Sequence, residues 1–160
     1  MTDASITIHR QHFQKINKIL ARLSVESIAR LVFLATRDGH PIASYGDLGD
    51  ADTTSFSSLA AGNVAATDSM ARLIGEDVFP AVIHEGERGS IYICVIGKSL
   101  LAVVFDERST LSLVKLRAKK ASHELAPILE EVMRVSENER EAGDSFFAKI
   151  TDEDINGLFS

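Results

Sequence analysis

The sequence predicts a small α/β domain in which a largely antiparallel five-stranded sheet carries helices on both faces. Three stretches with apolar residues at helical spacing alternate with short apolar runs, in the order helix, two strands, helix, three strands, helix. Because no long segment joins the strands within either group, neighbouring strands are expected to run antiparallel. The chain has 160 residues, 45% of them hydrophobic, which is enough for one domain with its own core.

The N-terminal part predicts a helix followed by a β-hairpin. A helix is expected over residues 8–23, where apolar residues recur on one face: Phe13, Ile16, Ile19, Leu20 and Leu23. Residues 31–35 form an apolar run typical of a buried strand, and residues 42–45 form the returning strand. Asp38-Gly39 between them is a hairpin turn signal.

The second helix, expected over residues 52–76, has two unlike faces. Asp52 or Thr53 can cap its start, and Gly75 can cap its end. The bulkier residues fall on one face, with Asn63 and Thr67 pointing toward the expected core: Phe56, Leu59, Ala60, Met70 and Ile74. The opposite face has almost no long side chains, although a solvated face would normally carry Lys and Glu. We call it the small-residue stripe: Thr54, Ser58, Ala61, Gly62, Ala65, Ser69 and, at its end, Arg72.

Short side chains let another backbone approach closely, so the small-residue stripe predicts a protein-binding surface. The alternative is an ordinary helix surface, since Ala, Ser and Thr are common there for reasons of propensity.

Three strands and a long helix are expected next. The strands are predicted over residues 79–84, 91–96 and 100–105, with turns at Glu87-Arg88-Gly89 and Gly97-Lys98. Ser109 or Thr110 opens the helix, whose apolar face extends to Val132 and includes either Ile128 or Leu129. We expect a kink or a break at Pro127, because proline removes a backbone hydrogen bond and clashes with the preceding turn.

The C-terminal residues differ from the rest in composition, which predicts a domain over 1–135, a flexible acidic linker over 136–144 and a tail over 145–160. Residues 1–135 carry 16 acids and 15 bases, whereas residues 136–160 carry 7 acids and 2 bases. Apolar residues return within the tail, which could order on a partner: Phe146, Phe147, Ile150, Ile155, Leu158 and Phe159. The alternative is a disordered tail.

Several function classes are disfavoured by the same sequence. The nearly neutral body lacks the basic footprint of a nucleic-acid-binding protein. No stretch is long and apolar enough to cross a membrane, and residues 1–5 do not resemble a secretory signal, so a cytoplasmic location is expected. The lone Cys94 is expected to be a small buried hydrophobe.

Catalytic and cofactor motifs are also lacking. Gly97-Lys98-Ser99 resembles the end of a phosphate-binding loop, but Tyr92 stands where that loop needs glycine. The histidines lack metal-ligand spacing, and no hydrolase nucleophile elbow is present. We therefore expect no cofactor, no metal and no catalytic residue, and an active site of its own is the less favoured alternative.

The chain resembles the Roadblock family over nearly its whole length. The resemblance is carried by residues 31–45, 50–66, 73–76, 79–80, 84–86 and 113–122. Its most specific parts are Leu-Ala-Ala-Gly-Asn-Val-Ala-Ala at 59–66 and the tail at 147–160, which resemble the bacterial members that act with a Ras-like GTPase. Where some relatives have glycine, this chain has Asp68-Ser69.

The resemblance implies a homodimer with one sheet continuous across two subunits and the two second helices side by side. It implies that one GTPase lies across that helix pair and is activated there, in a role in cell polarity or motility at a cell pole. The family's contact positions correspond to Ala65 and Ser69. The resemblance also implies that the tail tunes affinity or nucleotide exchange, with Ile150, Ile155, Leu158 and Phe159 in contact. The alternative is a scaffold that recruits a GTPase or polarity regulator without activating hydrolysis.

Overall fold

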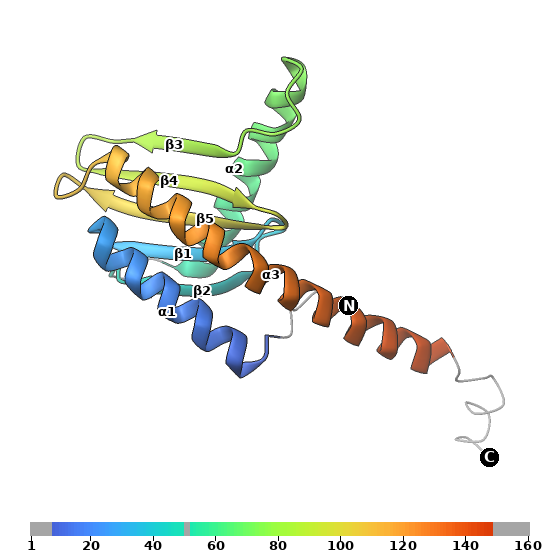
Figure 1. Cartoon of the computed structure of the whole chain (residues 1–160). Coiled ribbons are helices and arrows are strands. Elements are labelled where there is room, and N and C mark those ends of the chain that lie inside the picture. The colour runs from blue at the N-terminus through green and yellow to red at the C-terminus, as the bar shows by residue number, and fades with distance from the viewer. Residues whose placement is uncertain (1–7, 50–51, 149–160) are drawn as a thin grey trace.

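The computed structural model describes residues 8–49 and 52–148, and it confirms the predicted order of elements (Figure 1). The helices are α1 (Arg10–Ser27), α2 (Thr53–Leu73) and α3 (Leu111–Ala148). The strands are β1 (Leu31–Thr36), β2 (Pro41–Gly46), β3 (Ala81–Glu85), β4 (Gly89–Ile96) and β5 (Ser99–Asp106). Expected and observed strand boundaries differ by only a few residues.

The five strands form one antiparallel sheet in the order β2-β1-β5-β4-β3. β1 lies between its hairpin partner β2 and the distant β5, with Phe33 opposite Ala102. All six residues of β1 are buried, because helices cover both faces of the sheet there. β2 and β3 are the edge strands, and the described part of the chain pairs no further strand with either.

The two faces of the sheet bury separate apolar clusters. α1 and α3 cover one face, and α2 alone crosses the other (Figure 1). The cluster under α1 and α3 is built of large aliphatic side chains such as Leu20, Leu101 and Leu125. The cluster under α2 is smaller, and α2 contributes only Ala60, Ala61 and Val64 to its buried members.

α1 is longer at its C-terminal end than the sequence pattern predicts. The apolar repeat ends at Leu23, but the helix continues to Ser27 and is capped by Ile28 in the left-handed conformation, with φ of 53°. The backbone N–H groups of Ile28 and Ala29 donate to the carbonyls of Val25 and Ser24, which satisfies the end of the helix.

α3 is a single helix that continues through Pro127, so of the kink or break expected there, a break is not found. Pro127 lies inside the helix on its exposed side, where water can bond the carbonyl that the proline leaves free. Of the two alternatives left open for its apolar face, Leu129 is the buried one.

The stretch expected to be a flexible linker, 136–144, is also part of α3. It contains three Glu, one Arg and one Ala, which favour helix, and its contacts with the domain include two with side chains distant in the sequence. Lys98 Nζ donates to Glu137 Oε1 at 3.1 Å, and His9 Nε2 lies 3.3 Å from Glu139 Oε1. The absence of large apolar residues therefore did not mean the absence of structure.

Candidate partner-binding surface

α2 is held at both ends by the predicted caps. Asp52 precedes the helix, and its carboxylate accepts hydrogen bonds from the Thr54 N–H at 3.0 Å and the Ser55 hydroxyl at 2.8 Å. These hydrogen bonds to Ser55 and Thr54 lower the pKa of Asp52 below its ordinary value. At the other end Gly75 takes the left-handed conformation, with φ of 83°, which glycine adopts without a steric cost.

The side of α2 that faces the sheet is not the bulky side, contrary to the sequence-based expectation. Leu59, Met70 and Ile74 are exposed, with 74% of the surface of Leu59 accessible. The buried residues are small or polar: Ser57, Ala60, Ala61, Val64, Thr67, Asp68 and Ala71. Small residues let the helix lie close to the strands, and the T-shaped contact of Phe56 with Phe33 fixes its first half.

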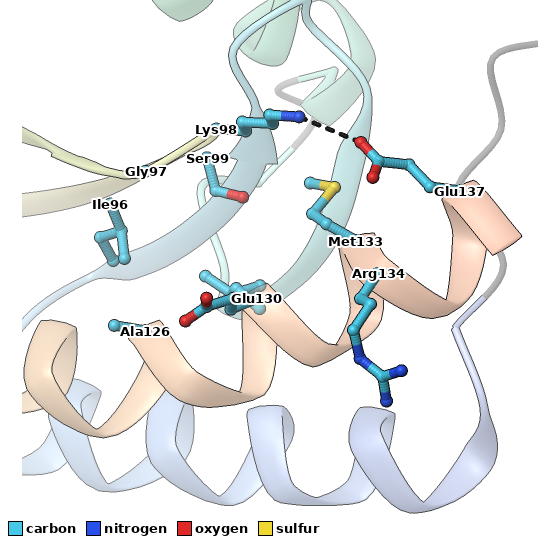
Figure 2. Close-up of a pocket in the computed structure, with 10 residues that line it drawn as sticks. Ile96, Gly97, Lys98, Ser99, Ala126, Glu130, Met133, Arg134 and Glu137 are labelled. Carbon is cyan, nitrogen blue, oxygen red and sulfur yellow. Dashed lines mark hydrogen bonds and ion pairs between the residues drawn. The ribbon is translucent and has the colours of Figure 1, made fainter.

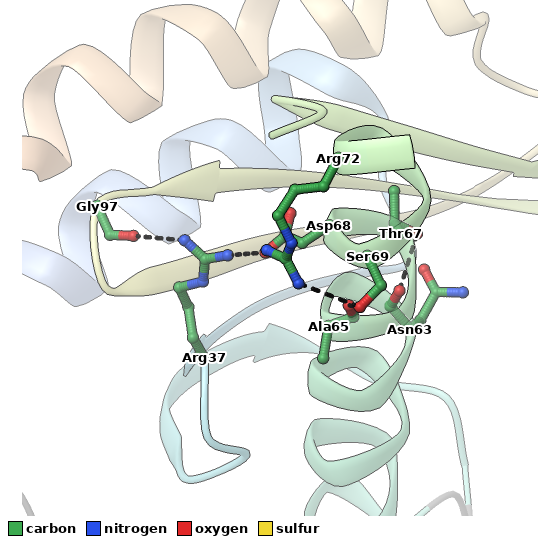
Figure 3. Close-up of polar contacts among 8 residues, drawn as sticks. All are labelled: Arg37, Asn63, Ala65, Thr67, Asp68, Ser69, Arg72 and Gly97. Carbon is green, nitrogen blue, oxygen red and sulfur yellow. Dashed lines mark hydrogen bonds and ion pairs between the residues drawn. The ribbon is translucent and has the colours of Figure 1, made fainter. Parts of the chain in front are cut away.

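The small-residue stripe is exposed, with one exception. Thr54, Ser58, Gly62, Ala65, Ser69 and Arg72 are accessible. Ala61 is buried against the sheet and cannot contact a partner from there, because its position on the wheel lies between the stripe and the sheet-facing side. Ser69 donates to the Ala65 carbonyl at 3.2 Å and Arg72 Nη2 donates to Ser69 Oγ at 3.3 Å (Figure 3). The side chains of Ser69 and Arg72 are therefore held in place by hydrogen bonds within α2.

A second exposed surface follows the opposite edge of α2, and sequence reasoning missed it. Leu59, Met70 and Leu73 lie at helical spacing on this edge and are all exposed; we call them the apolar edge. Beside it lies a groove of about 270 Å³, lined by Phe56, Leu59, Ala60, Asn63, His84, Ile91 and Ile93. His84 Nε2 on β3 lies 3.3 Å from Asn63 Oδ1, so this edge of α2 runs above the edge strand β3. The sequence does contain a signal for this surface, namely the bulky face of the second helix, but that face was expected to pack into the core.

Arg37 connects three segments at one end of the stripe. It follows β1, and its guanidinium forms an ion pair with the Asp68 carboxylate of α2 (Figure 3). Nη1 of the same guanidinium lies 3.5 Å from the carbonyl of Gly97, in the turn between β4 and β5. The Arg37 backbone N–H also donates to the Lys98 carbonyl at 3.0 Å. Thirty-one positions separate the two charged residues, and no local pattern in the sequence indicates their contact.

The turn at Gly97-Lys98 is a hairpin turn between β4 and β5, as predicted, and not part of a phosphate-binding loop. It borders a cavity. Figure 2 shows the cavity, of about 430 Å³, between this turn and α3. Lys98 is engaged by Glu137 across its mouth. The hydroxyl of Ser99 is buried at its side and has no hydrogen-bond partner among the described residues.

The remaining predicted contact residues lie outside the described part of the chain. Ile150, Ile155, Leu158 and Phe159 follow the last described residue of α3, Ala148. The side chains of Phe146 and Phe147 are likewise not described.

Cys94 is buried, as expected. Burial raises the pKa of its thiol, which keeps it protonated and unreactive at neutral pH. Within residues 8–49 and 52–148, no group of His, Cys, Asp and Glu side chains is placed to hold a metal ion. None of the described helices combines the length and apolar character that a membrane crossing requires.

Comparison with known proteins relates this arrangement to one family. The model of the Roadblock/LC7 domain matches residues 15–105, which include α2, all of the sheet except the last residue of β5, and most of α1. Among curated proteins the comparison finds no match.

Three solved structures are similar in both sequence and fold. MglB of Myxococcus xanthus is 45% identical with a TM-score of 0.74, and the match covers 79% of this chain and 96% of that one. The gliding protein MglB of Thermus thermophilus is 34% identical with a TM-score of 0.76, covering 81% and 99%. A further MglB, described with a tetrameric arrangement, is 32% identical with a TM-score of 0.77, covering 82% and 99%. The chain therefore belongs to the Roadblock/LC7 family and is MglB-like in sequence and fold.

Proposed function

We propose that this protein is a homodimeric activator of a bacterial Ras-like GTPase of the MglA type, with a role in cell polarity or motility. The observation that carries the proposal is the exposed small-residue stripe on α2, in a chain that is MglB-like over most of its length. The Thermus relative is described as a gliding protein, which supports the cellular role.

Homodimerisation is supported by the surface that one chain leaves open. β3 is an edge strand with unpaired backbone groups, and the apolar edge of α2 lies above it with Leu59, Met70 and Leu73 exposed. An open edge strand beside exposed apolar side chains is a surface that proteins normally cover. A second copy would pair its own β3 with this one and bury both apolar edges. Two small-residue stripes would then lie side by side.

The activator itself supplies no catalytic group in this proposal. Hydrolysis by a Ras-like GTPase needs a positioned water and stabilisation of the developing phosphate charge. Ala65 and Ser69 are short enough for a switch segment of the GTPase to lie against the α2 backbone, and its bound conformation would be the hydrolytic one. Activation then works by a shift of the switch population, and no inserted arginine is required.

The tail is proposed as a second contact with the same GTPase. Ile150, Ile155, Leu158 and Phe159 provide apolar side chains within an acidic segment that follows α3. Apolar anchors give affinity and the acidic residues steer association, so this contact would tune binding or nucleotide exchange. A chain lacking residues 149–160 should bind more weakly or change the exchange rate, and unchanged values of both would contradict this role.

The test is phosphate release by the cognate GTPase with GTP while the protein is titrated in. An activating dimer gives a rise that saturates near two chains per GTPase. Ala65→Arg should abolish the rise and leave the dimer folded, because the long side chain holds the partner away from the helix. Ala126→Arg is the matched control, since Ala126 is exposed on α3 across the sheet.

The scaffold alternative makes a different prediction in the same experiment. If the protein and the GTPase co-elute but phosphate release does not rise, the protein recruits without activating. If Ala65→Arg stimulates as well as the unchanged protein, the small-residue stripe is not the contact.

A further inference from the structure

The two halves of α2 are attached to the domain in different ways. Phe56, Ala60, Ala61 and Val64 join the first half to the apolar cluster under the helix, whereas the second half adds no member to that cluster. In Figure 1 the C-terminal end of α2 extends past the β3 edge of the sheet. The second half buries Thr67, Asp68 and Ala71 outside that cluster. It also bears Ala65, Ser69 and Arg72, so the proposed GTPase contact lies on the half of α2 that the apolar cluster does not hold.

Side-chain hydrogen bonds in the second half mostly stay within the helix. Thr67 donates to the Asn63 carbonyl at 2.8 Å, and Ser69 and Arg72 bond within the small-residue stripe. Across the described residues, the ion pair of Asp68 with Arg37 is the one side-chain polar link from residues 65–73 to the rest of the domain.

The environment of this ion pair makes its position well defined. Only 10% of the Asp68 side chain and 33% of the Arg37 side chain are exposed. Arg37 is itself fixed to the turn between β4 and β5 through the carbonyls of Gly97 and Lys98. A buried charge left without its partner is costly, so the helix cannot rotate or lift away from Arg37 cheaply.

We propose that Arg37, through its ion pair with Asp68, is the positioning residue that holds the second half of α2 in the orientation that binds the GTPase. This rests on the function proposed above. Arg37 need not touch the GTPase, because its guanidinium is already engaged by Asp68 and Gly97. Without the ion pair, α2 would occupy the binding orientation for only part of the time. The apparent affinity for the GTPase would fall in proportion to the fraction of time that α2 spends in the binding orientation. The rate of hydrolysis in the saturated complex would not change.

Asp68→Asn and Arg37→Gln test the proposal, since each removes one charge with little change in size. Both should raise the dimer concentration for half-maximal phosphate release roughly tenfold and leave the plateau rate unchanged. The exchanged pair, Arg37→Asp with Asp68→Arg, should restore much of the affinity. Asp106→Asn is the matched control, because Asp106 pairs with Arg108 two residues away and far from α2 along the chain.

Amide hydrogen exchange of the protein alone separates this inference from the proposed function. In both variants, exchange should speed up over residues 65–73 and stay unchanged over 54–64. If the unchanged protein stimulates no GTPase, the proposed function fails, and the exchange pattern still decides whether the ion pair holds α2. Should either neutral variant fail to fold, Arg37→Lys keeps the charge and should give a smaller shift in the same direction.

Two results would overturn the proposal. One is unchanged exchange and unchanged half-maximal concentration in both variants. The other is a lower plateau with Arg37→Gln while Asp68→Asn behaves as the unchanged protein, since Arg37 would then act on the GTPase directly.

Discussion

The helices on the two faces of the sheet bury different kinds of side chain. Under α1 and α3, large aliphatic side chains are buried completely, and polar contacts join the two helices at their rim, such as Arg117 Nη1 with Glu26 Oε2 at 3.7 Å. The side chains that α2 itself buries are short, and two of its large side chains, Leu59 and Met70, are exposed. The difference teaches that one face carries the larger apolar core, whereas the other leaves large apolar side chains exposed, as the proposed partner contacts require.

Two leucines express this comparison most directly, because Leu125 on α3 is 0% exposed and Leu59 on α2 is 74% exposed. We expect Leu125→Ala to lower the free energy of unfolding by about 3 kcal/mol, through lost burial and the cavity left behind. Urea unfolding followed by circular dichroism measures this. Leu116→Ala, an exposed leucine on the same helix, is the control and should cost less than about 0.5 kcal/mol. Equal effects of the two substitutions would contradict a core centred under α3.

Leu59→Asp sharpens the comparison from the other side. The monomer should stay folded, since the side chain is exposed, but the dimer should dissociate about a hundredfold more readily because a charge enters its apolar centre. Sedimentation velocity over a range of concentrations measures the dissociation constant. Val25→Asp is matched in exposure, also 74%, but lies on α1 and should leave the constant unchanged. A Leu59→Asp protein that dimerises normally would show that the apolar edge is not the dimer surface.

The smallest expected effect concerns the cap of α2. The pKa of Asp52 is lowered, so its stabilisation is present above the ordinary aspartate pKa of about 4 and is lost as pH falls through the lowered value. Asp52→Ala should therefore lower the melting temperature at pH 7, and the gap to the unchanged protein should narrow toward pH 2. Asp77→Ala, at an exposed aspartate beyond the helix, should show no such gap. A gap that is the same at both pH values would refute the capping role.

Local patterns were reliable wherever the determining contacts are local. The strands, the Asp38-Gly39 and Gly97-Lys98 turns, the Asp52 cap and the apolar face of α3 were all predicted, because each depends on residues a few positions apart. The same reasoning failed over 136–144, where helix formers and contacts with distant Lys98 and His9 extend α3 without large apolar residues.

The orientation of α2 could not be predicted in this way. A helical wheel separates bulky from small residues. The rule that the bulky residues face the core holds only when a chain buries them against itself rather than leaving them for a partner. Here close packing on the sheet selects the small side, and the bulky residues remain exposed on the open edge beside β3. The small-residue stripe was still identified, since five of its six small positions stay accessible on the new orientation and only Ala61 is lost to the sheet.

The sequence by itself determined the element order, the antiparallel hairpins, the caps of α2 and the family, because periodicity, turn residues and short motifs are properties of neighbouring residues. Only the tertiary structure decided which side of α2 meets the sheet and which residues hold its second half. Arg37, Asp68 and Gly97 come together from three segments, and their contact exists only once β1, β4, β5 and α2 have been placed against one another.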